Sequence, residues 1–249
     1  MRNSLMVNQS RRPTNRSLVR KGPKVEDYDR VLIVCEDSKS SPKYFEDLIR
    51  SERLSSANVR VTGDCGSDPM SVVNKAIEIY EKSLNETNLA AKYDQVFCLV
   101  DRDKHPNFSN ALNKVNQYRN NGYPIHWVAS DPCFEYWYLC HFTQYTKEIV
   151  STGNNSSGDN CVKLLNIEWR KTFNENYDKG KSKSYELLKN IDIKIPLANS
   201  QNTLKIAISN GVTNPSTQVH ELIKYLIHLK TETPKIIIYP NNSIYFIAQ

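Results

Sequence analysis

Residues 30–35, R-V-L-I-V-C, decide the fold of this 249-residue chain. The five consecutive apolar residues of this run, three of them β-branched, are typical of a strand buried on both faces, as in the middle of a parallel sheet. The polar run D-S-K-S-S (37–41) follows, and Pro42 suits the first turn of a helix that we expect to reach about Arg53. A buried strand followed closely by a helix is the beginning of a βαβ unit.

The alternation of strand and helix continues to about residue 129. We expect strands over residues 58–62, 93–100 and 123–129, each an apolar or alternating run. Helices are expected after Asp68 and over residues 111–120. This order predicts an α/β fold, a parallel sheet flanked by helices with right-handed crossovers.

The second half of the chain has a different pattern and is expected to be mostly helical. Residues 151–160, S-T-G-N-N-S-S-G-D-N, favour a flexible loop. Helices are predicted over 162–173, 185–189 and 203–209 and after Asn214-Pro215, and residues 235–247 are typical of a β-hairpin. The predicted domains are a basic, disordered arm (1–28), an α/β core (29–149), a flexible loop (150–160) and a helical C-terminal region ending in a hairpin (161–249).

Composition excludes several classes of protein. Hydrophobic residues make up 39% of the chain, which is enough for a core and excludes global disorder. No apolar run approaches the roughly 20 residues of a membrane span, so no membrane partner is expected. The six cysteines form no C-x-x-C pair, and Cys35 and Cys98 lie in apolar runs that are expected to be buried strands. We therefore expect free thiols in a reducing cytoplasm, without a zinc site.

The positive charge is concentrated at the start of the sequence. The chain carries 33 basic and 27 acidic residues, a net charge of +6, and residues 1–24 hold seven of the bases and none of the acids. This tail is a solvated arm, an organellar transit peptide, or an arm that contacts nucleic-acid phosphates. For the last case the candidate residues are Arg11, Arg12 and Arg16.

Acidic side chains follow each of the four predicted strands. Open parallel sheets bind their ligands outside the carboxyl ends of the strands, so these acids should meet at one edge. Gathered there, carboxylates repel one another unless a cation neutralises them, and hard oxygen ligands suit Mg²⁺ or Mn²⁺. In chain order the acids are Glu36, Asp64 and Asp68, Asp101 and Asp103, and finally Asp131 and Glu135.

Each of these acids could have a structural role in place of metal binding, and that role differs from one acid to the next. Asp68 and Asp131 each precede a proline that suits a helix start, so we expect both to cap helices. Asp64 lies in a turn-prone loop, whereas the i, i+2 spacing of Asp101 and Asp103 directly after a buried strand favours metal binding.

Glu135 lies within F-E-Y-W-Y-L, an aromatic helix start. It either interacts with the helix dipole or, in such apolar surroundings, needs a partner, which a metal or a lysine would supply.

Three further lysines, Lys179, Lys181 and Lys183, lie close together in residues 177–183, Y-D-K-G-K-S-K. They either bind phosphates or belong to a solvated surface loop. The end of this run resembles a P-loop, but Glu175 stands where that motif needs glycine, so no ATPase site is predicted. His105, which follows the Asp101–Asp103 pair, either assists proton transfer or has no role in the site.

These motifs together resemble the RloB-like family, bacterial proteins with a Toprim-type core. The resemblance extends from about residue 29 to 230, with the motifs in family order. It rests on V-L-I-V-C-E (31–36), K-Y-F (43–45), D-R-D-K-H (101–105), S-D-P-C-F-E-Y-W (130–137), L-C-H-F (139–142) and N-P-S-T (214–217).

The resemblance implies a role for four acids. Toprim domains of topoisomerases, primases and OLD-type nucleases use a glutamate after the first strand and Asp-x-Asp after a later one, positions that Glu36, Asp101 and Asp103 match. Glu135 matches the acid of the family's own P-C-F-E-x-W segment. The usual pattern has glycine directly after the first glutamate, and this chain has Asp37, which either narrows the approach to the site or adds a ligand.

The resemblance also implies a biological context. RloB-like proteins belong to phage-defence loci, with an AAA or ABC-type ATPase encoded nearby, and related Toprim effectors cleave nucleic acid, some of them tRNA. We therefore expect a Mg²⁺- or Mn²⁺-dependent nuclease, the effector of an abortive-infection system, that cleaves RNA such as tRNA, or DNA. Glu36, Asp101 and Asp103 would bind the metal and Glu135 would complete the catalytic set.

Two other functions are compatible with the sequence. One is a non-catalytic regulatory or binding partner of a defence ATPase, and the other is nucleotidyl transfer, because primases share the core. The sequence leaves the oligomeric state open.

Deleting residues 1–24 tests the role of the basic tail. If the tail binds phosphates, the slope of log affinity for labelled tRNA against log salt should become shallower by about 0.7–0.9 for each phosphate that the tail neutralises. Fluorescence anisotropy over a salt series measures this slope. An unchanged slope would show that the tail is only a solvated arm.

Overall fold

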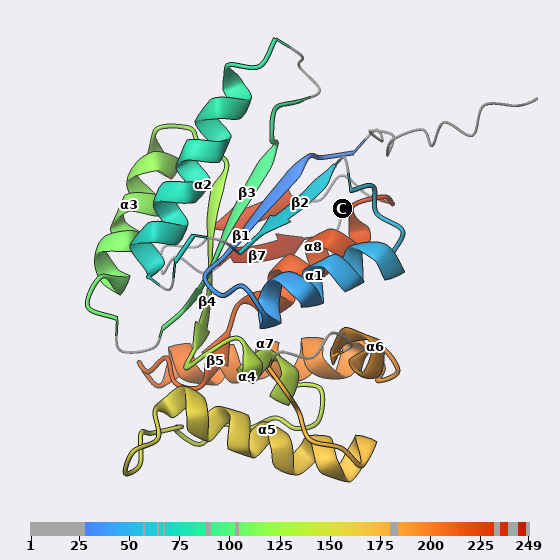
Figure 1. The fold of residues 1–249 in the computed structure, drawn as a ribbon. Coiled ribbons are helices and arrows are strands. Elements are labelled where there is room, and N and C mark those ends of the chain that lie inside the picture. Colours follow the sequence, from blue (N-terminus) through green and yellow to red (C-terminus); the bar gives the residue numbers. More distant parts are fainter. Residues whose placement is uncertain are drawn as a thin grey trace, which may run out of the picture.

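The computed structural model describes residues 28–56, 58–63, 65–66, 68–87, 91–102, 105–179, 184–231, 235–238 and 244–247. In these residues a five-stranded sheet has the order β2-β1-β3-β4-β5. The strands β1 (Val31–Cys35), β2 (Val59–Thr62), β3 (Gln95–Asp101) and β4 (Ile125–Asp131) are parallel, and β5 (Ser216–Thr217) is antiparallel to β4 (Figure 1). The predicted α/β fold with a parallel sheet is confirmed for β1 to β4, and the antiparallel strand β5 was not predicted.

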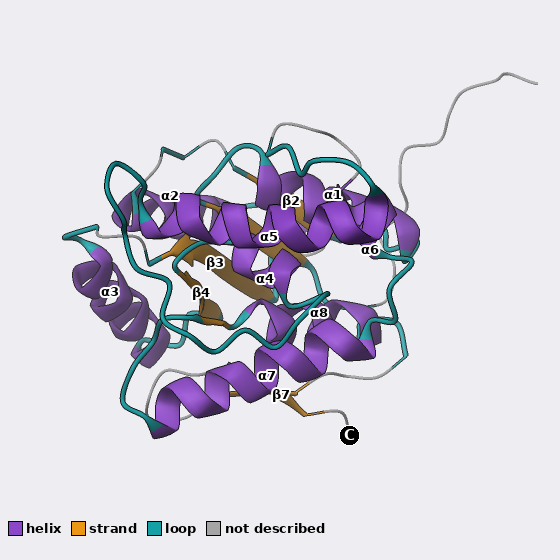
Figure 2. Ribbon diagram, turned by 90° about the horizontal axis from the view of Figure 1, so that it is seen from below, coloured by secondary structure: helices purple, strands orange, loops and turns teal. Residues whose placement is uncertain are grey.

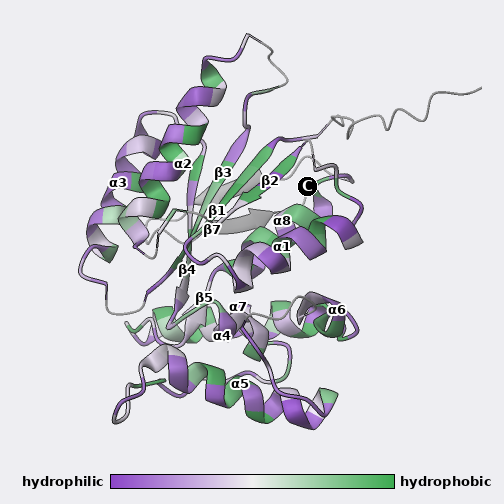
Figure 3. Ribbon diagram, viewed as in Figure 1, coloured by the Kyte–Doolittle hydropathy of each residue, from purple (hydrophilic) through white to green (hydrophobic). Residues whose placement is uncertain are grey.

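Helices cover both faces of the sheet. Helices α1 (Ser40–Ser51) and α8 (Val219–His228) lie on one face, and α2 (Pro69–Leu84) and α3 (Phe108–Asn120) lie on the other (Figure 1). The alternating residues of β1 explain this, since Val31, Ile33 and Cys35 pack on the side of α1 and α8 whereas Leu32 and Val34 pack on the side of α2 and α3. A strand buried on both faces requires the continuous apolar run seen in the sequence. Figure 3 shows the hydrophobic residues gathered on the strands and on the inward sides of these helices.

A further layer of helices lies beyond the carboxyl ends of the parallel strands. It consists of α4 (Glu135–Leu139), α5 (Ser157–Phe173), α6 (Ser184–Leu188) and α7 (Lys194–Ser209), seen face-on in Figure 2. Every residue of α4 is buried, and its Tyr138 ring packs against Tyr177 at 5.6 Å between centroids. The aromatic character of residues 134–138 is therefore a requirement of packing between the sheet and this layer.

The chain ends in an antiparallel strand pair. Strands β6 (Lys235–Ile238) and β7 (Ile244–Ile247) pair with Ile238 opposite Ile244, which confirms the predicted hairpin. No helix in the described ranges has both the length and the apolar character needed to cross a bilayer. All six cysteines are free thiols, and only Cys65 is not buried.

Two proline-based predictions of helix starts are wrong. The sequence predicted that Asp131 caps a helix beginning at Pro132, but β4 continues through Asp131, which pairs with Ser216 of β5, and α4 begins only at Glu135. Pro215 likewise opens no helix, because the next two residues form β5 and α8 begins at Val219. A two-residue strand is too short to show alternation, so its pattern could not be recognised. The predicted cap at Asp68 is confirmed by its hydrogen bond from the Ser71 amide, at 3.1 Å.

The loop predicted over residues 150–160 is shorter than expected. The Ser156 hydroxyl accepts a hydrogen bond from the Asp159 amide at 3.0 Å, and the Asp159 carboxylate accepts one from the Ser156 amide at 2.8 Å. This capping box starts α5 at Ser157, five residues before the predicted start. Helix α7 also begins earlier than predicted, at Lys194. The predicted disordered arm covers residues 1–28. Residues 1–27 lie outside the described part of the chain, and only Tyr28 lies within it.

Gly63 lies where the chain leaves β2 and passes the loop after β1. A Cβ atom at Gly63 would lie 2.3 Å from the carbonyl oxygen of Asp37 and 2.5 Å from Cγ of Pro42. We expect Gly63→Ala to lower the free energy of unfolding by about 1–3 kcal/mol, because backbone must move to admit the methyl group. Urea unfolding followed by circular dichroism measures the change.

Gly158→Ala is the matched control, since its Cβ would meet nothing closer than 3.6 Å. Alanine also favours the helix, so this variant should be neutral or more stable by about 0.5–1 kcal/mol. Equal stability of the two variants would contradict the close approach at Gly63.

Candidate functional site

Glu36 and Asp101 meet at the carboxyl edge of β1 and β3. The Asp101 amide donates a hydrogen bond to Oε2 of Glu36 at 2.9 Å, and the Glu36 amide donates to the carbonyl of Leu99 at 3.1 Å. On the other side, Nε2 of His105 lies 3.5 Å from Oε1 of Glu36. One oxygen of the Glu36 carboxylate is thus fixed to the neighbouring strand, while the other is next to a histidine that the chain places after β3.

Glu36 and Asp101 both lie in surroundings that disfavour their ionised forms. Burial raises the pKa of Glu36, although the Asp101 amide and His105 oppose the shift. The pKa of Asp101 is raised well above its usual range by burial first and then by Glu135 and Glu36, with Lys179 opposing. Burial is the largest cause of both shifts, and for Asp101 the charges of Glu135 and Glu36 add to it, so a nearby cation would stabilise its ionised form.

Glu135 occupies the first position of α4 and its side chain is completely buried. Its Oε1 atom accepts hydrogen bonds from the Ser40 hydroxyl at 2.7 Å and the Tyr177 hydroxyl at 3.1 Å, and lies 3.3 Å from Nζ of Lys179. Burial alone would raise the pKa of Glu135, but Lys179 and then Ser40 outweigh burial and lower it. Glu135 is therefore ionised at neutral pH. The sequence indicated a metal or a lysine as its possible partner, and the structure shows a lysine, Lys179.

The pairing also defines the environment of Lys179. Its pKa is raised because the attraction of Glu135, followed by Cys133 and Asp101, exceeds the effect of burial. The side chain is 47% exposed, so Lys179 is paired with Glu135 and still partly open to solvent. The sequence predicted Lys179 as a phosphate contact, and the structure places it within the carboxylate site.

Asp37 has a different role from the two considered from the sequence. Its Oδ2 atom accepts a hydrogen bond from the Ser40 amide at 2.6 Å, and Oδ1 accepts one from the Ser41 amide at 3.2 Å. Both carboxylate oxygens thus satisfy the first turn of α1, whose amides have no partner within the helix. Asp37 caps the helix that carries Ser40 toward Glu135.

The remaining predicted residues have separate positions. Asp131 lies beside the pair, 3.7 Å from Nε of Arg102, and Asp68 is engaged in capping α2. Other predicted residues, Arg11, Arg12, Arg16, Asp64, Asp103, Lys181 and Lys183, lie outside the described part of the chain.

Sequence reasoning missed Ser40 and Tyr177. They are 95 and 42 residues away from Glu135 in the chain, and each contacts its buried carboxylate. The only signal was indirect, since a buried carboxylate in an aromatic segment requires several donors. That requirement does not say where in the chain the donors lie.

Glu36 and Asp101 have the right donor chemistry for Mg²⁺ or Mn²⁺. Mg²⁺ commonly binds a protein through one or two carboxylates and keeps several waters. Within the described ranges, no group of three His, Cys, Asp or Glu side chains is arranged to hold a metal ion. Glu36 and Asp101 are two carboxylates of this kind, and Asp103, two residues after Asp101, stays a predicted third ligand.

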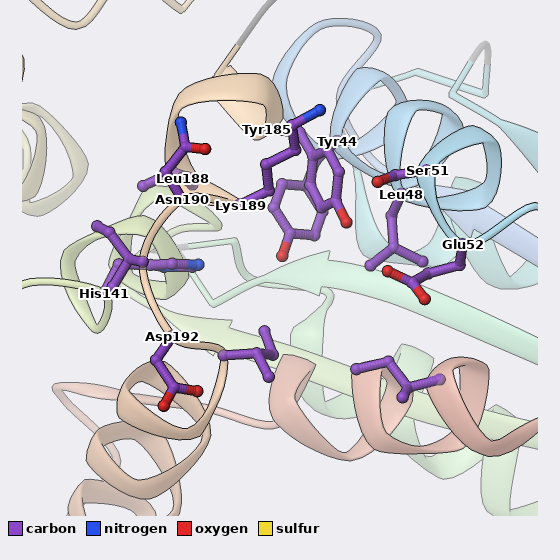
Figure 4. Close-up of a pocket in the computed structure, with 13 residues that line it drawn as sticks. Tyr44, Leu48, Ser51, Glu52, His141, Tyr185, Leu188, Lys189, Asn190 and Asp192 are labelled. Carbon is purple, nitrogen blue, oxygen red and sulfur yellow. The ribbon is translucent and has the colours of Figure 1, made fainter.

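A separate cavity of about 650 Å³ lies between α1, α6 and α8 (Figure 4). The Tyr44 and Tyr185 rings meet there edge to face at 5.2 Å. Burial lowers the pKa of the lining residue His141 to about 4, so this histidine is neutral at pH 7. None of the predicted site residues lines the cavity, which is therefore distinct from the carboxylate site.

Replacing Lys179 tests whether it neutralises Glu135. Lys179→Met leaves a buried carboxylate without its counter-charge, and we expect a loss of about 2 kcal/mol in the free energy of unfolding. This is less than the roughly 3–5 kcal/mol of a fully buried pair, because Lys179 is half exposed. Adding Glu135→Gln should restore part of the loss. Lys171→Met, which breaks the exposed pair with Glu168, is the control and should change stability by less than about 0.5 kcal/mol.

The effect of pH on the stability contributed by Glu135 should have opposite signs in the natural chain and in Lys179→Met. In the natural chain the lowered pKa of Glu135 contributes stability that is present above its ordinary value of about 4.5 and is lost as the pH falls through the lowered value. In Lys179→Met, burial raises that pKa, so the penalty is largest at neutral pH and disappears as the pH falls. Urea unfolding from pH 4 to 7, compared with Lys179→Met/Glu135→Gln, measures the difference. A penalty independent of pH would contradict the pairing.

The family described as RloB-like protein matches residues 31–226, which is more than half of the sequence. Neither the curated proteins nor the solved structures give a match. The matched region contains Glu36, Asp101, Glu135 and Lys179, and thus the whole described site. The chain belongs to the RloB-like protein family.

Proposed function

We propose that the chain is a metal-dependent nuclease that hydrolyses phosphodiester bonds of RNA, tRNA above all, or of DNA. The observation that supports it most is the Glu36–Asp101 pair. Both residues have raised pKa values, and the Asp101 amide binds the Glu36 carboxylate at the carboxyl edge of a mostly parallel sheet, where ligands of such sheets bind. A divalent cation held there would polarise the phosphate and lower the pKa of a coordinated water.

The residues around the pair fit this chemistry. Glu36 and Asp101, with Asp103 as predicted third ligand, would hold Mg²⁺ or Mn²⁺. The Lys179 side chain is 47% exposed and its charge acts on Asp101, so its ammonium group could stabilise negative charge on a phosphate. His105 lies 3.5 Å from Glu36, so a small movement would allow the two side chains to exchange a proton. Glu135 would keep Lys179 in place through their ion pair.

The family supports a role in phage defence. Through the Toprim resemblance, RloB-like membership favours an effector of abortive infection that acts with an AAA or ABC-type ATPase encoded nearby. The free thiols fit the reducing cytoplasm in which such an effector would act.

A non-catalytic partner of that ATPase is the second candidate. The specific observation in its favour is that Lys179 already neutralises Glu135, so the site is partly satisfied without a metal. In this case the carboxylate edge would recognise the partner protein or hold the site together. A cleavage assay separates the two functions.

We expect the full chain to cleave tRNA or plasmid DNA in Mg²⁺ or Mn²⁺, with EDTA abolishing cleavage. Asp101→Asn and Glu36→Gln should each reduce the rate about 100-fold or more, because each removes a charge that holds the cation. Glu168→Gln, the same change at an acid that pairs with Lys171 on α5, should retain full activity. Gel electrophoresis of the products measures the rates.

If the chain alone is inactive, the assay is repeated with the neighbouring ATPase and its nucleotide. Inactivity in both settings, in either metal, would reject the nuclease and favour the binding partner. Cleavage that survives in Asp101→Asn and Glu36→Gln would place the catalytic site elsewhere.

A further inference from the structure

A cavity of about 650 Å³ adjoins the Glu36–Asp101 pair on the side of β4. We propose that it binds an unpaired nucleobase with an exocyclic amino group, namely adenine, cytosine or guanine, from the nucleotide next to the bond to be cut. The proposal rests on the proposed function and adds to it a base-binding subsite. We call this cavity the base pocket.

The position of the base pocket links it to the carboxylate pair. Its lining includes Arg102, the residue after Asp101, and His105, which also lies 3.5 Å from Glu36. Asp131, at the end of β4, and residues 148–151 form other parts of the wall. A nucleotide whose phosphate lies at the carboxylate pair can therefore place its base in this pocket.

The pocket offers a stacking surface. The guanidinium group of Arg102 lies over the Phe108 ring, 5.0 Å from its centroid, and Trp127 supports that ring edge to face at 5.1 Å. Arg102 keeps 45% of its side chain exposed, so the surface turned away from Phe108 is available for contact. Nucleobases in single-stranded RNA stack on aromatic rings and on guanidinium planes, which this Arg102–Phe108 pair supplies.

The charges in the pocket favour a base over a phosphate. Asp131 and Glu148 line it together with Arg102, and Asp131 lies 3.7 Å from Arg102. Two carboxylates beside one guanidinium would repel a phosphate, whereas carboxylates accept hydrogen bonds from the amino groups of bases. Adenine, cytosine and guanine carry such an amino group, and uracil and thymine do not.

The wall that carries Glu148 is held in place. The side chain of Asn214 accepts a hydrogen bond from the Ile149 amide and donates one to the Ile149 carbonyl, both at 3.0 Å. This pair of bonds ties residue 149 to the segment before β5, so the pocket is formed before a ligand binds. A preformed site loses less conformational entropy on binding. Its volume also lies within the range of about 300–1,000 Å³ typical of small-ligand sites.

The test measures the affinity of the full chain for fluorescein-labelled octanucleotides of a single base, in EDTA so that no cleavage competes. We expect (rA)₈ and (rC)₈ to bind about 10-fold more tightly than (rU)₈. Phe108→Leu should weaken binding of (rA)₈ and (rC)₈ about 10-fold, because it removes the ring on which the Arg102 guanidinium plane lies. Glu148→Gln should reduce the preference over (rU)₈ to within about 3-fold, because an amide can donate as well as accept. The series (dA)₈, (dC)₈ and (dT)₈ shows whether the pocket also serves DNA.

Two controls keep the result specific. Phe173→Leu removes an aromatic ring at the far end of α5 and should leave all affinities unchanged. Glu148 is exposed, so its variant should fold normally even if Phe108→Leu does not, and thermal melts verify both.

Each outcome decides the proposal. Equal affinity for all three RNAs, absence of binding, or a preference that survives in both Phe108→Leu and Glu148→Gln would overturn the base pocket. Any of these results together with cleavage in the earlier assay would leave the nuclease standing without this subsite. If the preference over (rU)₈ disappears in both Phe108→Leu and Glu148→Gln, but the natural chain cleaves nothing in the earlier assay, the pocket is supported and the nuclease is rejected.

Discussion

The buried carboxylate of Glu135 is the constraint on which the rest of the site depends. A charge with no exposed surface must be paired and hydrogen-bonded, and its partners come from separate parts of the chain. Ser40 begins α1, Tyr177 and Lys179 follow α5, and Glu135 itself begins α4. The contacts of its Oε1 atom therefore join the helical layer to the carboxyl edge of the sheet, whereas the buried Oε2 atom has no hydrogen-bond partner among the described residues.

This arrangement divides the negative charge of the edge into two parts. Glu135 is neutralised within the protein by Lys179, which lowers its pKa. Burial raises the pKa values of Glu36 and Asp101, and neither has a lysine or arginine as close as Lys179 is to Glu135 among the residues that the structure describes. In our account the protein supplies the counter-charge for the first part and a divalent cation supplies it for the second. Lys179, between the two, is then positioned to face a bound phosphate.

Much of the fold could be predicted from the sequence, because the decisive signals are local. The apolar run of β1 and the alternation after it predicted the parallel sheet and the carboxyl-edge position of Glu36 and Asp101. The wrong predictions concern segments whose local sequence pattern is overridden by contacts with distant parts of the chain. Asp131-Pro132 and Asn214-Pro215 have the local pattern of helix starts, but pairing between β4 and β5 overrides it. The donors of Glu135 were also out of reach, since a buried charge specifies that partners exist and not which residues they are.

Binding of Mn²⁺ tests the central claim most directly, because it asks whether the carboxylate pair holds a divalent cation without requiring turnover or a partner protein. Electron paramagnetic resonance of free Mn²⁺, titrated with the full chain, measures the bound fraction. The account predicts binding that Asp101→Asn and Glu36→Gln each abolish, and that Glu168→Gln retains. Absence of Mn²⁺ binding, or equal binding by all four proteins, would contradict it.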